Sequence, residues 1–123
     1  MQYRIKIFPG YVSANLRNEL FQMADAIVLP YRKVFQSGVM LMGMSYGKAV
    51  IASDLLPNKE IINDGVNGYL FKSNDEASLS SVINKAMGDD VMRQEMGKAG
   101  KKYVSTNHNW DLIASKWLTL FEK

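Results

Sequence analysis

The stretch SGVMLMGMSYGKAVIASD, from Ser37 to Asp54, carries the alternation of helix and strand that decides the fold. Ser37 is a good helix N-cap, and Gly47 follows the apolar positions as a glycine at a helix end does. Ala49 to Ala52 then form a short continuous apolar run, which is typical of a strand buried on both faces. The stretch therefore predicts a helix over 37–47 that is followed directly by a buried strand.

The segments on both sides repeat this alternation. The other predicted elements are a strand over Tyr3–Phe8, a helix after Ser13, a strand buried on both faces over Ala26–Leu29, a short helix at Pro57, a strand over Tyr69–Phe71, and helices after Asn74 or Asp75, over 89–104 and after Asn109. Apolar strands that alternate with helices indicate an α/β fold with a parallel sheet. We expect one domain over residues 1–123, with about four parallel strands flanked by helices in three layers.

The helix after Asn74 or Asp75 shows amphipathic spacing. Its apolar positions are Leu79, Val82, Ile83, Ala86 and Met87, all on one face. Gly88 follows and is expected to end the helix. These residues therefore predict one apolar face along this helix.

Composition excludes several classes of site. The chain has 123 residues, of which 47% are apolar, which is enough for a packed core. It has no cysteine, so disulfides and thiolate metal sites are excluded, and the single histidine cannot build a multi-histidine metal site. A reducing cytoplasm is compatible with this composition, and we expect a cytoplasmic protein.

Charge argues against a nucleic-acid partner. The net charge of +3 is a mild excess, whereas nucleic-acid binders usually carry a denser basic stripe. Lys98, Lys101 and Lys102 share a predicted helix and are most simply a solvated face. The alternative is peripheral contact of these lysines with anionic lipid heads at the inner face of the membrane.

Ser37 and Gly38 raise the possibility of a phosphate site. Ligands of parallel sheets bind at the carboxyl ends of the strands, here residues 30–36, 53–58 and 72–74. A helix that begins at Ser37 has unpaired N–H groups there, and Gly38 lets an anion approach the backbone. Arg32 and Lys33 could add positive charge. The alternative is that Ser37 only caps a core helix, and the residues alone leave both interpretations open.

The ordered combination of motifs closely resembles the C-terminal, nucleotide-sugar-binding domain of the retaining GT-B glycosyltransferases of family 4, or group 1. The likeness covers essentially the whole chain. The matching pieces are Ala24-Asp25, Pro30, Met44-Ser45-Tyr46-Gly47, Val50 to Asp54, Glu60, Asp64-Gly65-Val66-Asn67-Gly68-Tyr69-Leu70 and Asn109-Trp110.

The resemblance implies a donor site for a UDP- or GDP-linked sugar, with no cofactor and no metal. The loop 31–36 would lie near the donor sugar, and the start of the helix would meet the donor diphosphate through backbone N–H groups. Met42 would stand where the family usually has a glutamate that binds the nucleotide ribose. Glu60 matches the family's acidic position. The alternative is that it is only an exposed acidic residue near the N-terminus of a helix. The implied donor-binding residues are Gln36, Ser37, Gly38, Val39, Met42 and Glu60.

Two positions depart from the family pattern. The family signature is a glutamate, seven residues and a second glutamate, and the matching positions here are Val34 and Met42. A thioether is a weak hydrogen-bond acceptor, so Met42 would pack against the ribose or base instead of binding its hydroxyls. The Ser-Gly form of the loop is similar to a subset of bacterial members. No catalytic residue can be assigned.

The family also has segments that precede the part matched here. These are two further strand–helix units, with a Gly-rich turn and cations for the diphosphate, and an N-terminal acceptor domain. We therefore expect the C-terminal half of a GT-B C-terminal domain that is inactive alone. A bare sheet edge is a liability. We expect that a second copy of the chain covers it in a homodimer, or that the Tyr3–Phe8 strand moves beside the Ala26–Leu29 strand.

Two functions follow as hypotheses. The first is the donor-binding part of a glycosyltransferase of polysaccharide biosynthesis, which moves a sugar to a saccharide or lipid acceptor with retention. The second is a non-catalytic module that binds nucleotide sugars or a partner, which the residues at Val34 and Met42 favour. A receiver-like regulatory domain would need clustered acids at the strand ends, where only Asp54 stands.

Overall fold

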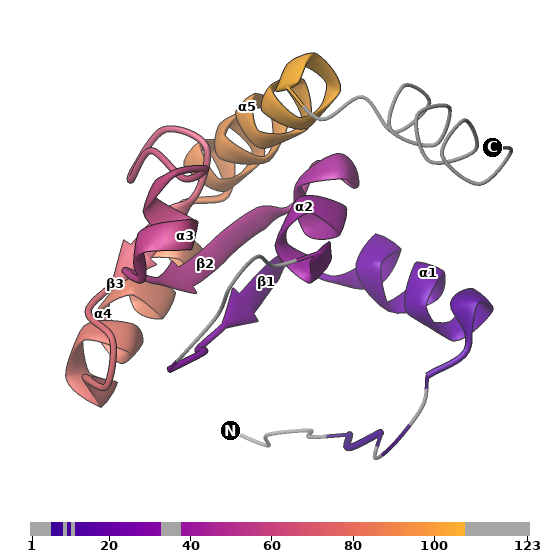
Figure 1. Cartoon of the computed structure of the whole chain (residues 1–123), viewed down its shortest axis with the longest axis horizontal. Helices are drawn as coiled ribbons and strands as arrows, with labels where there is room; N and C mark the ends of the chain where they lie inside the picture. The colour runs from indigo at the N-terminus through magenta and orange to yellow at the C-terminus, as the bar shows by residue number, and fades with distance from the viewer. Residues whose placement is uncertain (1–5, 9, 11, 33–37, 108–123) are drawn as a thin grey trace, which may run out of the picture.

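The computed structural model describes residues 6–8, 10, 12–32 and 38–107 of the 123-residue chain (Figure 1). Helices and strands alternate along it as expected. In chain order the elements are α1 (Ala14–Met23), β1 (Ala26–Leu29), α2 (Gly38–Ser45), β2 (Ala49–Ser53), α3 (Leu56–Lys59), β3 (Tyr69–Phe71), α4 (Glu76–Met87) and α5 (Asp90–Asn107). No helix among these residues is long and apolar enough to cross a membrane. The helix predicted after Asn109 lies outside the described residues.

The three described strands form one parallel sheet in the order β1-β2-β3, with β2 in the middle. Alternate residues of β2 face opposite sides, as strand geometry requires. Val50 and Ala52 pack with α2 and the end of α5, whereas Ala49 and Ile51 pack with α4. The predicted three-layer α/β fold with a parallel sheet is therefore confirmed.

Helix caps are where the sequence predicted them. The Ser13 hydroxyl accepts a hydrogen bond from the Leu16 N–H at 3.2 Å, and the Asp75 carboxylate accepts one from the Ser78 N–H at 2.9 Å. Each cap satisfies an N–H group that has no partner inside its helix. Gly47 follows α2 with a φ of +75°, which glycine adopts without strain.

The fourth strand is not found in the described part of the sequence predicted to form it. Residues 6–8 are in no strand and are exposed, with 80% of Ile7 accessible, and residues 3–5 lie outside the described residues. Figure 1 shows this segment running apart from β1. A strand persists only where a neighbouring strand exchanges hydrogen bonds with it. The described sheet thus has three strands where about four were expected, and the homodimer through its edge stays a prediction.

Burial on both faces was predicted correctly for β2 and wrongly for β1. All five residues of β2 are buried, whereas in β1 only Leu29 is buried and Val28 is 38% exposed. The reason is helix coverage, since α4 packs on β3, at the opposite edge of the sheet from β1. β3 is also an edge strand of the described sheet, yet its Tyr69 and Phe71 are buried. Met87, on the apolar face predicted for α4, is 43% exposed.

Tyr69, the first residue of β3, carries a buried hydroxyl with no hydrogen-bond partner among the described residues. The side chain is 3% exposed. Burial, and then the negative charges of Asp89 and Asp64, raise the pKa of Tyr69 above its usual value. The folded chain therefore keeps the phenolic proton at a pH where the unfolded chain loses it.

We expect the free energy of unfolding to fall as pH rises above about 10, because only the unfolded chain then ionises Tyr69. Tyr69→Phe should remove that decline. At pH 7 it should leave stability unchanged or raise it by up to about 1 kcal/mol, since it removes an unpartnered polar group. Urea unfolding at pH 7 and at higher pH measures both. Tyr31→Phe, at an exposed tyrosine, is the control that should keep the decline. A loss of stability at pH 7 in Tyr69→Phe would contradict this account.

Candidate functional site

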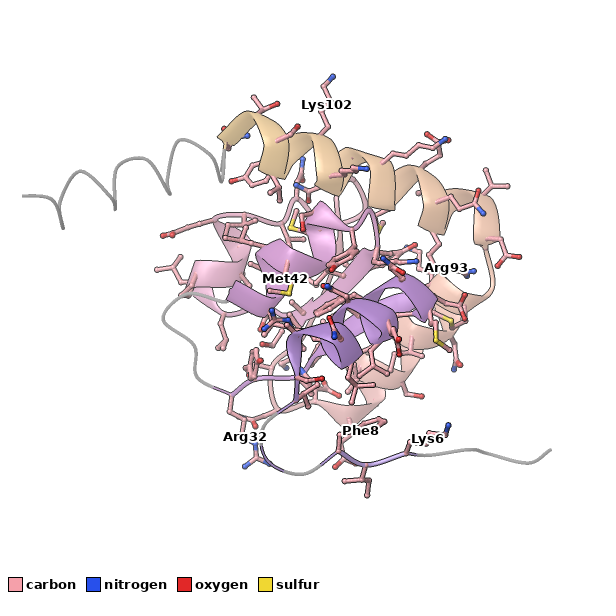
Figure 2. All side chains as sticks on the ribbon, turned by 90° about the vertical axis from the view of Figure 1, so that its right-hand side faces the viewer. Lys6, Phe8, Arg32, Met42, Arg93 and Lys102 are labelled. Carbon is pink, nitrogen blue, oxygen red and sulfur yellow. The ribbon has the colours of Figure 1, made fainter. Side chains whose placement is uncertain are left out.

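A pocket of about 640 Å³ lies between α1 and the exposed side of α2. It contains three of the residues that the sequence singled out, Gly38, Val39 and Met42. The other described residues that line it are Arg17, Asn18, Ser45 and Tyr46. Figure 2 shows Met42 on the face where α1 and α2 lie side by side. The structure therefore brings part of the predicted donor site into one cavity with α1.

The pocket has a fixed back wall, because α1 and α2 are joined by side chains. The Tyr46 hydroxyl donates to the Asn18 side-chain oxygen, and the Tyr46 ring stacks on Phe21 with centroids 5.3 Å apart. The Ser45 hydroxyl donates to the Met42 carbonyl at 2.7 Å, within the last turn of α2. The two Tyr46 contacts join α1 to the end of α2 beside the cavity.

Two features of the pocket lining suit an anion. Arg17 is the only charged residue among those described as lining it. α2 begins at Gly38, where a Cβ would meet no atom within 4 Å, so the space beside the first turn is open. Unpaired N–H groups and the helix dipole favour negative charge at such a helix start. Gln36 and Ser37, the other predicted residues of this helix start, lie outside the described residues.

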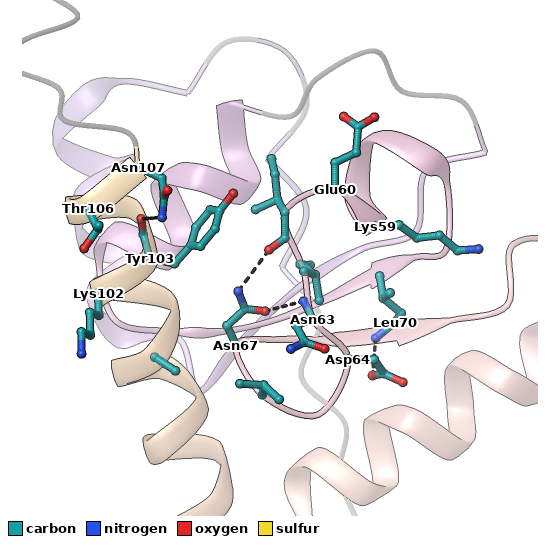
Figure 3. Close-up of a pocket in the computed structure, with 14 residues that line it drawn as sticks. Lys59, Glu60, Asn63, Asp64, Asn67, Leu70, Lys102, Tyr103, Thr106 and Asn107 are labelled. Atoms are coloured by element: carbon teal, nitrogen blue, oxygen red, sulfur yellow. Dashed lines mark hydrogen bonds between the residues drawn. The ribbon is translucent and has the colours of Figure 1, made fainter.

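Glu60 lies in a different pocket, of about 790 Å³, between the loop after α3 and the C-terminal part of α5 (Figure 3). The Glu60 side chain is exposed, and in Figure 3 it points away from Asn67 and Asp64. Lys59 and Lys102 also line this pocket. The structure therefore does not bring Glu60 into the α1–α2 pocket with Met42.

The Asp-Gly-Val-Asn-Gly motif holds the loop of this second pocket in shape. The Asn67 side-chain oxygen accepts from the Asn63 N–H at 2.7 Å, and its amide donates to the Ile61 carbonyl at 3.1 Å. The Asp64 carboxylate accepts from the Leu70 N–H at 2.9 Å. Asn67 is 7% exposed and both ends of its amide are satisfied. These residues shape the turn into β3, and their described hydrogen bonds are made within residues 61–70.

The loop that follows β1 is fastened to the end of β2 by buried polar groups. The Ser53 hydroxyl donates to the Tyr31 carbonyl at 2.7 Å, and the Asn58 amide donates to the Ser53 carbonyl at 2.8 Å. Asn58 is 1% exposed, and its side-chain oxygen has no partner among the described residues. This pair fixes the backbone of Tyr31 beside the end of β2.

Two cations and one acid were considered for the site from sequence. Arg32 lines a small separate pocket of about 170 Å³ with Asp75 and Glu76, so it does not face Met42. Lys33 lies outside the described residues. Asp54 accepts from the Ser73 N–H at 2.9 Å, which gives this carboxylate a structural partner.

Sequence reasoning missed the residues that α1 brings to the pocket, Arg17 and Asn18, and the role of Tyr46. α1 was recognised only from its cap and its apolar spacing. The polar side of an amphipathic helix gives no local signal of what it faces. The pairing of Tyr46 with Asn18 joins residues 28 positions apart, which spacing within one element cannot show.

The family model described as "Glycosyl transferases group 1" matches residues 6–103 of the chain. The phosphatidyl-myo-inositol mannosyltransferase of Mycobacterium leprae is 30% identical over 116 residues, which cover 94% of this chain and 31% of that protein. The chain spans 22% to 31% of the length of the first curated relatives that it matches.

Solved structures share the fold. The sucrose-phosphate synthase of Thermosynechococcus elongatus superposes with a TM-score of 0.83 at 23% identity, and the match covers 94% of this chain and 29% of that one. Anabaena HepE, solved in complex with UDP-glucose, gives a TM-score of 0.75 at 19% identity, covering 85% of this chain and 29% of that one.

Proposed function

Because the chain belongs to the group 1 glycosyltransferases, we propose that it forms the donor-binding part of an enzyme that transfers a sugar from a nucleotide diphosphate. The donor is a UDP- or GDP-linked sugar, and the acceptor is a saccharide or a lipid. Transfer proceeds with retention of configuration. The chain is a minor part of the length of its relatives, so for the chain alone we propose binding without transfer.

The observation that carries this proposal is the α1–α2 pocket. Its lining includes both the open start of α2 at Gly38 and Arg17. The Gly38 and Val39 N–H groups lie in the first turn of α2, where an intrahelical partner is lacking. We propose that they donate to the diphosphate, and that Met42 packs against the nucleoside. Gln36 and Ser37 extend the same helix start in sequence.

We propose that the N–H donors and Arg17 act by electrostatic stabilisation of the departing diphosphate. When the glycosidic bond to the diphosphate breaks, negative charge grows on the departing oxygens. Fixed N–H donors and a nearby cation stabilise that charge more than they stabilise the intact donor. Neither a metal nor a cofactor is part of the proposal. Glu60, in the second pocket, is proposed to meet another part of the donor from the loop after α3.

Calorimetric titration with UDP and GDP tests the site. We expect binding of at least one diphosphate, and weaker binding of inorganic phosphate, which is too small to fill the pocket. Arg17→Ala should weaken diphosphate binding about fivefold, because it removes one charge-assisted contact at a partly solvated position. Lys98→Ala, at an exposed position on α5, is the matched control with the same loss of charge. Equal affinities of the two variants would count against the site.

A second candidate is a non-catalytic module that binds nucleotide sugars. It is favoured by the residues at Val34 and Met42, neither of which is acidic. The two candidates differ in their genes, since an acceptor domain in the same reading frame supports the transferase. We propose a cytoplasmic location for either form.

A further inference from the structure

We infer that the α1–α2 pocket recognises its ligand without an anionic acceptor, so that ribo- and 2′-deoxyribonucleoside diphosphates bind with nearly equal affinity. Met42 is the residue that sets this specificity. The inference rests on the proposed function, which puts a nucleoside diphosphate in this pocket. It adds that the pocket recognises the diphosphate of the ligand and gains little affinity from the ribose 2′-hydroxyl.

Met42 stands at the centre of the wall that α2 presents to the pocket. Val39, Met42 and Ser45 follow one another at intervals of three residues, so their side chains share one face of the helix. All three line the cavity, and Met42 is only partly buried. In Figure 2 the labelled Met42 lies on the face where α1 and α2 meet. A ligand in the pocket therefore meets the thioether of Met42.

The described lining of the pocket contains no aspartate or glutamate. Glu19 follows Asn18 on α1 but does not line the cavity. The charge that the described residues bring to this pocket is thus the single positive charge of Arg17.

The polar groups of the pocket are weighted toward donors. The Asn18 side-chain oxygen already accepts from Tyr46, and the Ser45 hydroxyl already donates to the Met42 carbonyl. The Asn18 amide N–H groups, the Arg17 guanidinium and the helix N–H groups are all donors. The side-chain acceptors that a ligand hydroxyl could still use are all neutral: the second lone pair of the Asn18 oxygen, and the hydroxyl oxygens of Ser45 and Tyr46 near the far end of α2.

A ribose diol and a diphosphate need opposite kinds of hydrogen-bonding partner: the diol needs acceptors and the diphosphate needs donors. A diphosphate accepts hydrogen bonds, which this pocket supplies. A diol donates two hydrogen bonds. A carboxylate is the acceptor that binds it most strongly, because hydrogen bonds to charged groups are about twice as strong as neutral ones. A thioether accepts only weakly. The 2′-hydroxyl therefore gains little beside Met42, and a deoxyribose loses little by lacking it.

The test is a pair of calorimetric titrations of the 123-residue chain, UDP against 2′-deoxy-UDP and GDP against 2′-deoxy-GDP. We expect dissociation constants within about threefold in each pair, since a weakly rewarded hydroxyl changes affinity little. A preference of more than tenfold for the ribonucleotide overturns the inference and leaves the proposed function standing. Absence of binding by all four nucleotides overturns the proposed function, and the inference with it.

Substitution of Met42 tests the residue itself. Met42→Glu supplies an anionic acceptor of similar length and should create a preference for the ribonucleotide of about tenfold. Met42→Gln, the neutral variant of the same shape, should create a smaller one. The added charge also repels the diphosphate, but this acts on both nucleotides and cancels in their ratio. Thermal unfolding shows whether the variant is folded. A folded Met42→Glu with an unchanged ratio overturns the assignment, and an unfolded variant leaves the wild-type ratios to decide it.

Discussion

Gly97→Ala is expected to lower the free energy of unfolding by about 3 kcal/mol or more, which is a large part of the stability of a small domain. A Cβ placed on Gly97 would lie 2.0 Å from the Gly47 carbonyl oxygen and 2.9 Å from its carbon. Both atoms belong to the backbone, so no side chain can rotate to make room. α5 would have to move away from the start of β2.

This contact is close because two backbones cross there. Gly47, with its φ of +75°, forms the turn between α2 and β2, and its carbonyl faces α5. α5 packs against both α2 and β2, so a shift of α5 disturbs the core on that side of the sheet. Alanine would gain about 1 kcal/mol of helix propensity over glycine, which is smaller than the cost of the clash.

Urea unfolding of Gly97→Ala beside Gly100→Ala measures the effect. Gly100 lies on the same helix, and its nearest neighbour to an added Cβ is the Asn67 carbonyl oxygen at 3.2 Å. The gain in helix propensity is the same at both positions, and the contact at Gly100 needs a shift of only a few tenths of an ångström. We expect Gly100→Ala to stay within about 1 kcal/mol of the wild type. Equal stability of the two variants would contradict this prediction, because it would show that α5 can move away from Gly47 at little cost in free energy.

Ile51→Ala is expected to lower the free energy of unfolding by about 3 to 4 kcal/mol. Ile51 is the middle residue of the middle strand, fully buried among Tyr69, Phe71 and Met96. Removing three side-chain carbons there loses their transfer free energy and leaves a cavity that the sheet cannot close. Ile51→Val, which removes one carbon, should cost about 1 kcal/mol.

The matched control is Val28→Ala. Val28 pairs with Ile51 in the register of β1 and β2, yet it is 38% exposed. It can therefore give up only part of the burial free energy of a core valine, and we expect a loss below about 1 kcal/mol. Chemical unfolding of both variants gives the comparison. Similar losses at the two paired positions would mean that β1 is covered in solution, as the homodimer would require.

The contrast between β1 and β2 shows which structural features an apolar run in the sequence can predict. Both runs read alike in the sequence, and both form strands at the predicted residues. Apolarity predicts that a segment will pair in a sheet, but not which place in the sheet it takes. The segment over residues 6–8 shows the same limit, since an alternating pattern predicts a strand only where a partner strand stands beside it.

Some residues of the candidate site could be predicted from the sequence, and others only from the tertiary structure. Gly38, Val39 and Met42 could be singled out because they lie within one stretch that carries the cap, the helix and the strand. Glu60 was grouped with them by resemblance, and the structure places it in a separate pocket. Arg17 and Asn18 could not be found, because their position beside Met42 depends on how α1 packs.

The sequence by itself determined the helices, their caps, the buried middle strand and the three-layer class. These depend on interactions within a few residues, such as the Asp75 cap, and on periodicity along one element. Only the tertiary structure decided which side chains share the α1–α2 pocket and where two backbones nearly touch. The Tyr46–Asn18 hydrogen bond and the Gly47–Gly97 contact join residues far apart in the chain. Such contacts exist only once the helices have packed on the sheet, so no local pattern encodes them.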